Sequence, residues 1–145
     1  MSSSPASPDP ANSSASPFAS VDEMLVRLQS PLTARELWKV ASRVGMSAEQ
    51  FERLSGVSPH RLRRGRGGEE AVDEAKNASF LRIGRLYKRV LALCNQDEGA
   101  ARAWFNSPAP LLKNKKPIEA AETAPGAKNV DGLVTQLEKA AGLAK

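Results

Sequence analysis

Apolar and polar residues repeat with a helical period in the first half of the chain, and polar caps mark the expected helix starts. Three pairs have the spacing of a capping box ahead of an apolar face: Ser20 with Glu23, Thr33 with Glu36, and Ser47 with Gln50. Pro31, Gly45 and Gly56 stand where these helices should end. We therefore expect three short helices between residues 20 and 56.

A fourth helix should begin after Ser58, with Pro59 at its first position, where a missing N–H costs nothing. The segment Ala48–Arg64 then has the proportions of a helix-turn-helix, with two short helices joined by a three-residue turn. Val57 can fill the space between the two helices, and Leu62 can anchor the second one while its neighbours face outward. These elements make a small tri-helical unit.

Beyond Glu69 the pattern predicts a longer amphipathic helix that runs to Cys94, with acidic residues in its first turns, where the helix dipole favours negative charge. The polar stretch Asn77–Ser79 is a candidate break within it. Asp97 should cap the next helix. The side chains expected to face the core from that helix are Ala100, Ala101, Trp104 and Phe105.

Pro108, Pro110 and Pro117 exclude regular structure between them, because proline removes a donor and forces extended geometry on its predecessor. A short helix should follow. The remaining features predict a turn and then a last helix: Thr123, Pro125 and Gly126 for the turn, and Asn129 as the helix cap. No segment alternates apolar and polar residues as a half-buried strand would, so we predict an all-α fold.

Composition sets the domain layout. The first twenty residues include eight Ser, four Pro and four Ala, which offer too little burial to offset the entropy of ordering them. We expect a disordered tail over residues 1–20, a helix-turn-helix DNA-binding domain over residues 21–68, and a second helical domain over residues 69–145. We also expect a soluble, cytoplasmic protein, because the chain has no membrane-length apolar run, no secretory start and one cysteine.

Charge is concentrated in one place, since residues 32–66 carry a net charge of +5, equal to that of the whole chain. A local basic excess is typical of a phosphate-binding surface. An exposed arginine on a helix in the major groove can read guanine or grip phosphates. We expect DNA contacts from Ser58, His60, Arg61, Arg63, Arg64 and Arg66.

Two features qualify this interpretation. Glu52 stands four residues before the turn glycine, where such units usually have a small residue, and a carboxylate there would separate the helices. Arg64-Gly65-Arg66 is similar to the core of an AT-hook, although Gly67 replaces the proline that would extend it. The alternative is a degenerate helix-turn-helix kept as a dimerisation or structural element.

The chain offers little for catalysis. His60 and Cys94 lie in different segments, and no carboxylate has the spacing of a metal site or of an activated nucleophile. Cys94 falls on the apolar side of a helix, where a small buried hydrophobe is the ordinary interpretation. We predict no enzyme activity, no metal and no cofactor.

The proline-bounded loop carries two leucines, Leu111 and Leu112, and the lysines Lys113, Lys115 and Lys116 beside a tryptophan, Trp104. An apolar side chain surrounded by cations next to an aromatic residue is typical of a protein interface. The alternative is an ordinary surface loop whose lysines provide solubility.

The order of residues from Phe80 to Leu137 resembles the carboxy-terminal toxin-binding domain of the Xre/MbcA/ParS antitoxin family. The segment ahead of it resembles that family's Xre-type helix-turn-helix. The residues and groups that carry the resemblance are Arg85-Leu86-Tyr87, Asp97-Glu98, Ala100-Ala101-Arg102, Trp104-Phe105, Pro108, Pro110, Leu111-Leu112, Pro117, Thr123, Gly126, Val130 and Leu133.

The resemblance implies an all-helical homodimer that pairs with a RES-domain toxin, a protein similar to ADP-ribosyltransferases that consumes or transfers from NAD. It implies that the carboxy-terminal region covers the toxin's NAD cleft while the helix-turn-helix binds promoter DNA. NAD would then be the toxin's ligand, and this chain should bind none. The toxin contacts that follow from the resemblance are Trp104, Leu111, Lys113, Lys115, Lys116 and Thr123.

Three hypotheses stay open from the sequence. The chain is a toxin-neutralising antitoxin that also represses its own operon, or a stand-alone DNA-binding regulator whose carboxy-terminal domain dimerises, or an adaptor without DNA affinity. A neighbouring gene for a RES-type protein favours the first. Binding to the chain's own promoter separates the third from the other two.

Overall fold

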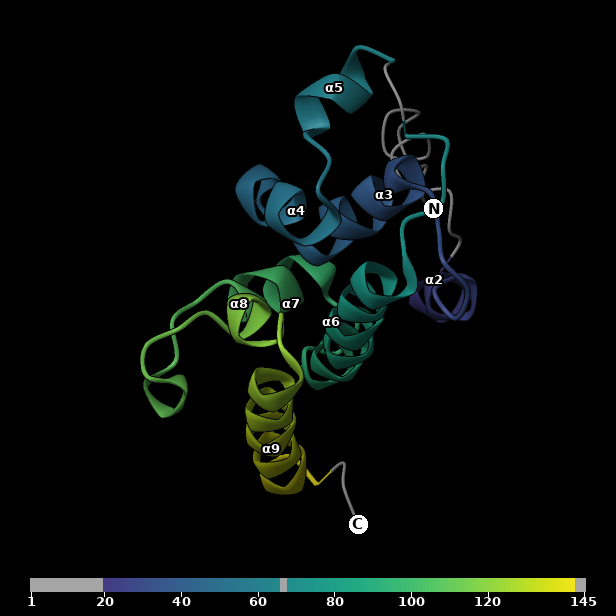
Figure 1. Ribbon diagram of the computed structural model, residues 1–145. Coiled ribbons are helices and arrows are strands. Elements are labelled where there is room, and N and C mark those ends of the chain that lie inside the picture. The colour runs from purple at the N-terminus through teal and green to yellow at the C-terminus, as the bar shows by residue number, and fades with distance from the viewer. Residues whose placement is uncertain (1–19, 66–67, 143–145) are drawn as a thin grey trace.

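A computed structural model of the chain describes residues 20–65 and 68–142. In those residues every regular element is a helix, and two isolated β-bridges join Thr33 to Ala71 and Ala109 to Lys115 (Figure 1). The all-α prediction is confirmed over this part of the chain, whereas the expected disordered tail lies outside it. In order the elements are α2 (Val21–Arg27), α3 (Ala34–Val44), α4 (Ala48–Ser55), α5 (Pro59–Arg63), α6 (Glu74–Leu93), α7 (Glu98–Phe105), the 3-10 turn η2 (Pro110–Leu112), α8 (Pro117–Ala120) and α9 (Ala124–Ala140).

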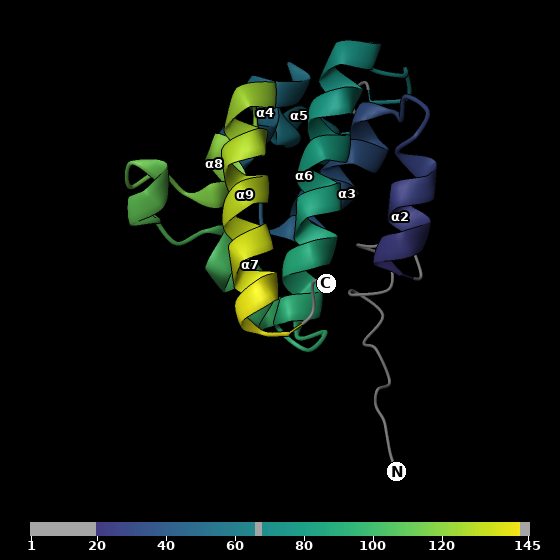
Figure 2. The same ribbon diagram turned by 90° about the horizontal axis from the view of Figure 1, so that it is seen from below.

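Helix α6 is the centre of the fold. Helices α2, α3, α4, α7 and α9 all pack against it, and Figure 2 shows it between α2 and α9. Beyond its first turn, its exposed residues form a stripe at helical spacing, Arg85, Lys88 and Ala92. Apolar side chains occupy the other sides and remove their surface from water, which is the main stabilising contribution in such a bundle. The fully buried ones include Phe80 and Tyr87.

One apolar core joins the two halves of the chain. The Trp38 ring on α3 packs edge-on against Phe51 of α4 at 5.0 Å between centroids, and Phe51 packs in the same manner against Phe80 of α6 at 5.8 Å. Two turns further along the same side of α6, the Tyr87 ring lies 6.0 Å from the Phe105 ring of α7, measured between centroids. Edge-on aromatic pairs stabilise beyond their burial alone, so the helices on either side of residue 68 share a single packed interior.

The caps predicted for the first four helices are confirmed. Thr33 and Glu36 form a complete capping box at the start of α3. Ser20, Ser47 and Ser58 accept hydrogen bonds from backbone N–H groups in the first turns of α2, α4 and α5. Each of these bonds satisfies a donor that the helix itself leaves unpaired, which is why these starts are readable from sequence.

The predicted course of α6 was wrong in two respects. The helix begins at Glu74, with Asp73 as its cap, because residues before it run extended beside the start of α3, where Val72 N–H donates to Leu32 O at 3.0 Å. The helix also runs unbroken through Asn77. That side chain is 4% exposed, donates to Leu28 O at 2.8 Å and accepts from Leu32 N–H at 2.9 Å. It therefore ties the α2–α3 connection to α6.

Two further expectations in the second half were wrong. Ala100 is exposed, and Ala101 and Phe105 are the residues of α7 that are buried. Asn129 lies inside α9, which begins at Ala124 with Thr123 as its cap. The Pro125-Gly126 pair therefore belongs to a first helical turn, where proline is tolerated.

Gly126 is needed where α8 and α9 meet, because a Cβ built on it would lie 1.9 Å from the carbonyl oxygen of Ala120. Gly132 lies on the same helix, and a Cβ added there would meet no heavy atom of another element within 4 Å. The two glycines thus share a helix and differ in packing.

We predict opposite effects for the same substitution at these two positions. Gly126→Ala should lower the free energy of unfolding by about 1–3 kcal/mol, because α8 and α9 must separate. Gly132→Ala should raise it by about 0.5–1 kcal/mol, because alanine is the better helix former. Urea denaturation followed by circular dichroism measures both, and equal effects at the two sites would contradict the α8–α9 contact.

Candidate functional site

Helix α5 is fixed to the body of the protein by its apolar side. Pro59 and Leu62 are buried, as predicted for Leu62, and Val57 is half-buried against the core. Arg35 of α3 donates to Leu62 O at 3.1 Å, which holds the end of α5 against α3. The helix has five residues, so its outward side chains are presented on little more than one turn.

The outward side chains of α5 form what we call the basic surface: His60, Arg61, Arg63 and Arg64. All four are exposed, and within the described part of the chain no carboxylate pairs with any of the three arginines. Figure 1 shows α5 at one end of the molecule, away from α9. Ser58 caps the helix by accepting from His60 N–H at 3.2 Å.

Two sequence features near this surface have clear positions. The Glu52 side chain is exposed, and α4 and α5 remain in contact. Contrary to our expectation, this carboxylate therefore does not separate the two helices. Arg64 and Gly65 of the AT-hook-like run are described, whereas Arg66 and Gly67 lie outside the described residues. The described part of the basic surface is therefore α5 and Arg64.

The second surface is the lysine loop, residues 109–116, which projects from the body beside α8 and α9 (Figures 1 and 2). Backbone hydrogen bonds close it on itself. Ala109 N–H donates to Lys115 O at 3.0 Å, and Asn114 N–H donates to Ala109 O at 2.9 Å. The prediction of irregular structure between Pro108 and Pro117 holds only in part, because η2 forms one ordered turn at the tip.

The two leucines of the loop point in opposite directions. Leu112 is buried and joins the core, whereas Leu111 is 72% exposed. Lys113 and Asn114, which follow, adopt left-handed backbone conformations with φ of 57° and 64°. Such conformations cost free energy for residues with a Cβ, and the hydrogen bonds across the loop hold them in place.

The remaining residues predicted for partner binding lie around the base of the loop. Lys115 is exposed, while Lys116 is half-buried at the start of α8. Trp104 is half-buried and stacks on Phe105 at 6.3 Å between centroids. Thr123 is exposed and accepts from Gly126 N–H at 3.1 Å, so its hydroxyl caps α9.

A polar cluster around the buried Gln50, which the sequence did not indicate, connects α4 to the base of the lysine loop. The Gln50 side chain, 2% exposed, donates from Nε2 to Ile118 O at 3.0 Å and to Glu122 Oε2 at 2.8 Å. Arg53 donates to the same carboxylate at 2.6 Å, and Arg82 donates to Glu122 O at 3.0 Å. Helix α4 is thereby anchored to the α8–α9 connection.

Arg89 attaches α9 to α6. Its guanidinium donates to Glu138 at 2.8 and 3.1 Å and to Thr135 at 2.9 Å, and it pairs with Asp131. The hydrogen bonds from Arg89 lower the pKa of the Glu138 carboxyl below its ordinary value, and the same contacts raise the pKa of Arg89. This contact fixes α9, the last helix of the described chain, against α6.

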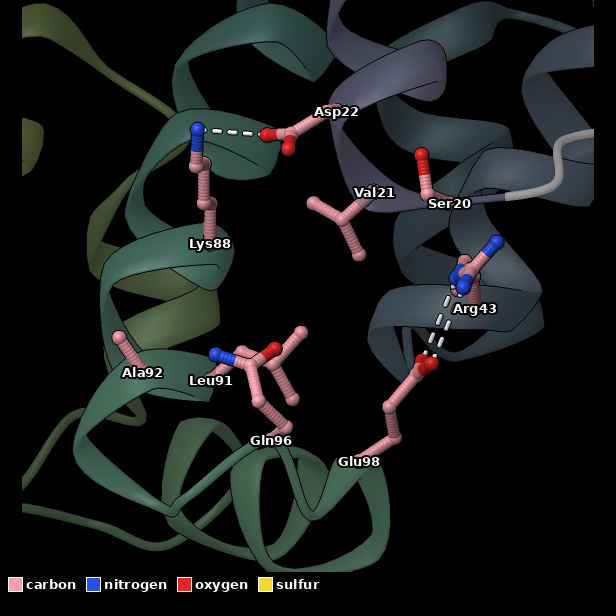
Figure 3. Close-up of a pocket in the computed structure, with 9 residues that line it drawn as sticks. All are labelled: Ser20, Val21, Asp22, Arg43, Lys88, Leu91, Ala92, Gln96 and Glu98. Carbon is pink, nitrogen blue, oxygen red and sulfur yellow. Dashed lines mark hydrogen bonds and ion pairs between the residues drawn. The ribbon is translucent and has the colours of Figure 1, made fainter.

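A third feature is a pocket of about 260 Å³ between α2, α3, α6 and α7 (Figure 3). Lys88 pairs with Asp22 on one side, and Arg43 pairs with Glu98 at 3.0 Å on the other. Burial opposes ionisation of Glu98, but the hydrogen bond and charge of Arg43 outweigh it and lower the pKa of this carboxyl. A ligand here would have to displace existing ion pairs, and the space is smaller than the roughly 300–1,000 Å³ usual for ligand pockets.

Within residues 20–65 and 68–142, no group of three or more His, Cys, Asp and Glu side chains could hold a metal ion. No helix in that part of the chain has the length and apolar character needed to cross a membrane.

These features define a class: an all-helical protein that presents a short basic helix at one end and a closed, cationic loop beside its last helix. Residues 89–139 match the family described as Antitoxin Xre/MbcA/ParS C-terminal toxin-binding domain. The family recognised from the sequence is thereby confirmed over this segment, which runs from the end of α6 through the lysine loop and α9. The basic surface lies outside the matched residues. A comparison with curated proteins gives no match.

We predict that the attachment of α9 weakens in acid. Because the folded-state pKa of Glu138 lies below its ordinary value of 4.5, its contribution to stability is complete above pH 4.5 and is lost as the pH falls through the folded-state value. At neutral pH, Glu138→Gln should lower the free energy of unfolding by about 0.5–1 kcal/mol. Urea denaturation across this pH range should show the difference from the wild type shrinking in acid. Glu70→Gln, at an exposed carboxylate, is the control, and a pH-independent difference for Glu138→Gln would contradict the assignment.

Proposed function

We propose that this chain is the antitoxin of a type II toxin–antitoxin system, that it neutralises a RES-domain toxin in the cytoplasm, and that it represses its own operon by binding promoter DNA. The observation that carries the antitoxin role is the match of residues 89–139 to a toxin-binding domain. The toxin class, the DNA activity and a homodimeric state are the further parts of the proposal.

The lysine loop supports the neutralising role. It lies within the matched segment, projects from the body, and is closed by hydrogen bonds, so little conformational entropy is lost when a partner binds it. Downstream of the loop, Arg89 holds α9, and the Gln50–Glu122 contact holds the α8–α9 connection. In the proposal, this loop together with Trp104 and Thr123 covers the toxin's NAD cleft, and the chain itself binds no NAD.

The basic surface supports the DNA-binding role. Its arginines are exposed and lack carboxylate partners in the described part of the chain, so they are available to phosphates or base edges. Because α5 has five residues, we expect phosphate contacts to contribute more of its affinity than base contacts do. The contacts proposed are Ser58, His60, Arg61, Arg63 and Arg64, with Arg66 beyond the described residues.

The same basic surface favours a second candidate function, a stand-alone transcriptional regulator in which the carboxy-terminal helices provide dimerisation. This alternative needs α5 but no toxin. The two functions are separated by whether the product of the adjacent gene is toxic and is bound by this chain.

Co-expression tests the proposed function directly. We expect the product of the adjacent gene to arrest growth when expressed alone, and co-expression of this chain to restore growth and to yield a co-purifying complex. An empty vector and an unrelated small helical protein are the controls. If the adjacent product is not bound and growth is unaffected by this chain, the antitoxin role is wrong, and promoter binding alone would support the regulator.

Removing positive charge from α5 tests whether DNA and the toxin bind to separate surfaces. Arg61→Ala combined with Arg63→Ala should weaken promoter binding and flatten the slope of log K against log salt by about one unit per lost phosphate contact. Arg85→Ala, at an exposed arginine on α6, is the control for a loss of positive charge elsewhere. Growth rescue should be unchanged in both variants, so a loss of rescue in the double variant would place toxin contacts on α5.

A further inference from the structure

Two large apolar side chains are exposed in the described part of the chain: Leu111 at 72% and Val26 at 65%. A single exposed aliphatic residue is ordinary on a soluble protein. Their settings differ. Val26 lies on α2, far in sequence from the matched domain, whereas Leu111 lies at the tip of the lysine loop within it.

The backbone around Leu111 holds it outward. Leu112 N–H donates to Ala109 O at 2.9 Å and Lys113 N–H donates to Pro110 O at 3.1 Å, which forms the η2 turn. Leu112 is buried beneath it, so the turn has one leucine in the core and one in solvent. Because hydrogen bonds already close the turn that carries Leu111, its backbone loses little freedom on binding.

The backbone immediately after Leu111 is strained. Lys113 and Asn114 both have positive φ, a conformation that glycine would adopt without cost. Strain of this kind persists where the surrounding structure fixes it, and it is common in segments that bind partners. At Lys113 it places a lysine, rather than a glycine, beside the exposed leucine.

The charges around the tip are of one sign and lack internal partners. Within the described residues, no carboxylate forms an ion pair with Lys113, Lys115 or Lys116. Elsewhere in the fold, arginines that hold helices together, such as Arg53 and Arg89, each have one. The surface complementary to this tip is an apolar pocket with carboxylates at its rim.

Resting on the proposed function, we propose that Leu111 is the anchor of the antitoxin: it inserts into an apolar pocket of the toxin, and Lys113 and Lys115 meet carboxylates at the rim of that pocket. The leucine supplies most of the resistance to dissociation, because it is the side chain that becomes fully buried. The lysines accelerate association and make it sensitive to salt. A leucine, rather than a lysine, therefore occupies the centre of the interface.

Binding of purified full-length chain to the purified product of the adjacent gene, in a catalytically inactive form, tests this assignment by biolayer interferometry. Leu111→Ala should raise Kd by roughly 10–100-fold, mainly through faster dissociation. Leu111→Met should stay within about threefold of the wild type, because it keeps an apolar side chain of similar volume. Val26→Ala, which removes the other exposed aliphatic side chain, should leave Kd unchanged.

The lysines are tested by salt dependence. Lys113→Gln with Lys115→Gln should slow association and flatten the dependence of log Kd on log salt. Lys76→Gln, at an exposed lysine of α6 that pairs with Asp73 and lies outside the matched segment, is the control for loss of a lysine elsewhere and should change neither. Thermal unfolding of each variant should match the wild type, because all these side chains are exposed.

The outcomes distinguish a failure of the Leu111 anchor from a failure of the proposed antitoxin function. Wild-type binding that Leu111→Ala weakens less than about threefold would overturn the anchor and leave the antitoxin role standing. A salt dependence that the lysine pair does not alter would overturn the acidic rim. Absence of any binding by the wild type would overturn the proposed function and the anchor together.

Discussion

Burial of α6 on nearly all sides is the constraint on which the rest of this structure depends. Each fully buried aromatic or large aliphatic side chain on it contributes about 1.5–3 kcal/mol relative to exposure, and five other helices supply the surfaces that cover them. A helix with so little exposed surface cannot form in isolation from its neighbours. Helices α2, α3 and α4 and the helices of the matched segment, residues 89–139, therefore pack around it from both sides of the domain boundary that we predicted between residues 68 and 69.

Polar groups inside this body set the positions of its elements. Asn77 joins the α2–α3 connection to α6, and Gln50 joins α4 to the α8–α9 connection. Both side chains are buried, so a loss of either partner would leave an unsatisfied polar group, which costs about 1–3 kcal/mol. Apolar packing alone would permit neighbouring helices to slide, whereas these bonds fix their register.

Local signals in the sequence located most of the helices, and non-local contacts account for the errors. The cap at Thr33 acts within three residues, so spacing alone reveals it, whereas Asn77 looked like a break because its partners are 45 and 49 residues away. Part of the candidate site could be predicted from the sequence for the same reason. The lysines of the loop and the arginines of α5 are recognisable in the sequence as local runs of basic residues. The opposite directions of Leu111 and Leu112, and the left-handed backbone at Lys113, depend on hydrogen bonds that form only when the chain is folded.

The cationic side chains of this protein fall into two groups. Those that form ion pairs with carboxylates hold elements together, and those without such pairs are available to partners. Arg53 and Arg89 each bridge two elements through a carboxylate, and their charge is neutralised locally. In the described residues, the cations without a carboxylate partner occur mainly as two runs, on α5 and in the lysine loop, while Arg82, Arg85, Lys128 and Lys139 are single. Removing a paired arginine leaves a carboxylate without its counter-charge and loosens the fold, whereas removing an unpaired one changes only the surface potential. Most of the unpaired positive charge of the described residues therefore lies at the two surfaces where we propose that DNA and toxin bind.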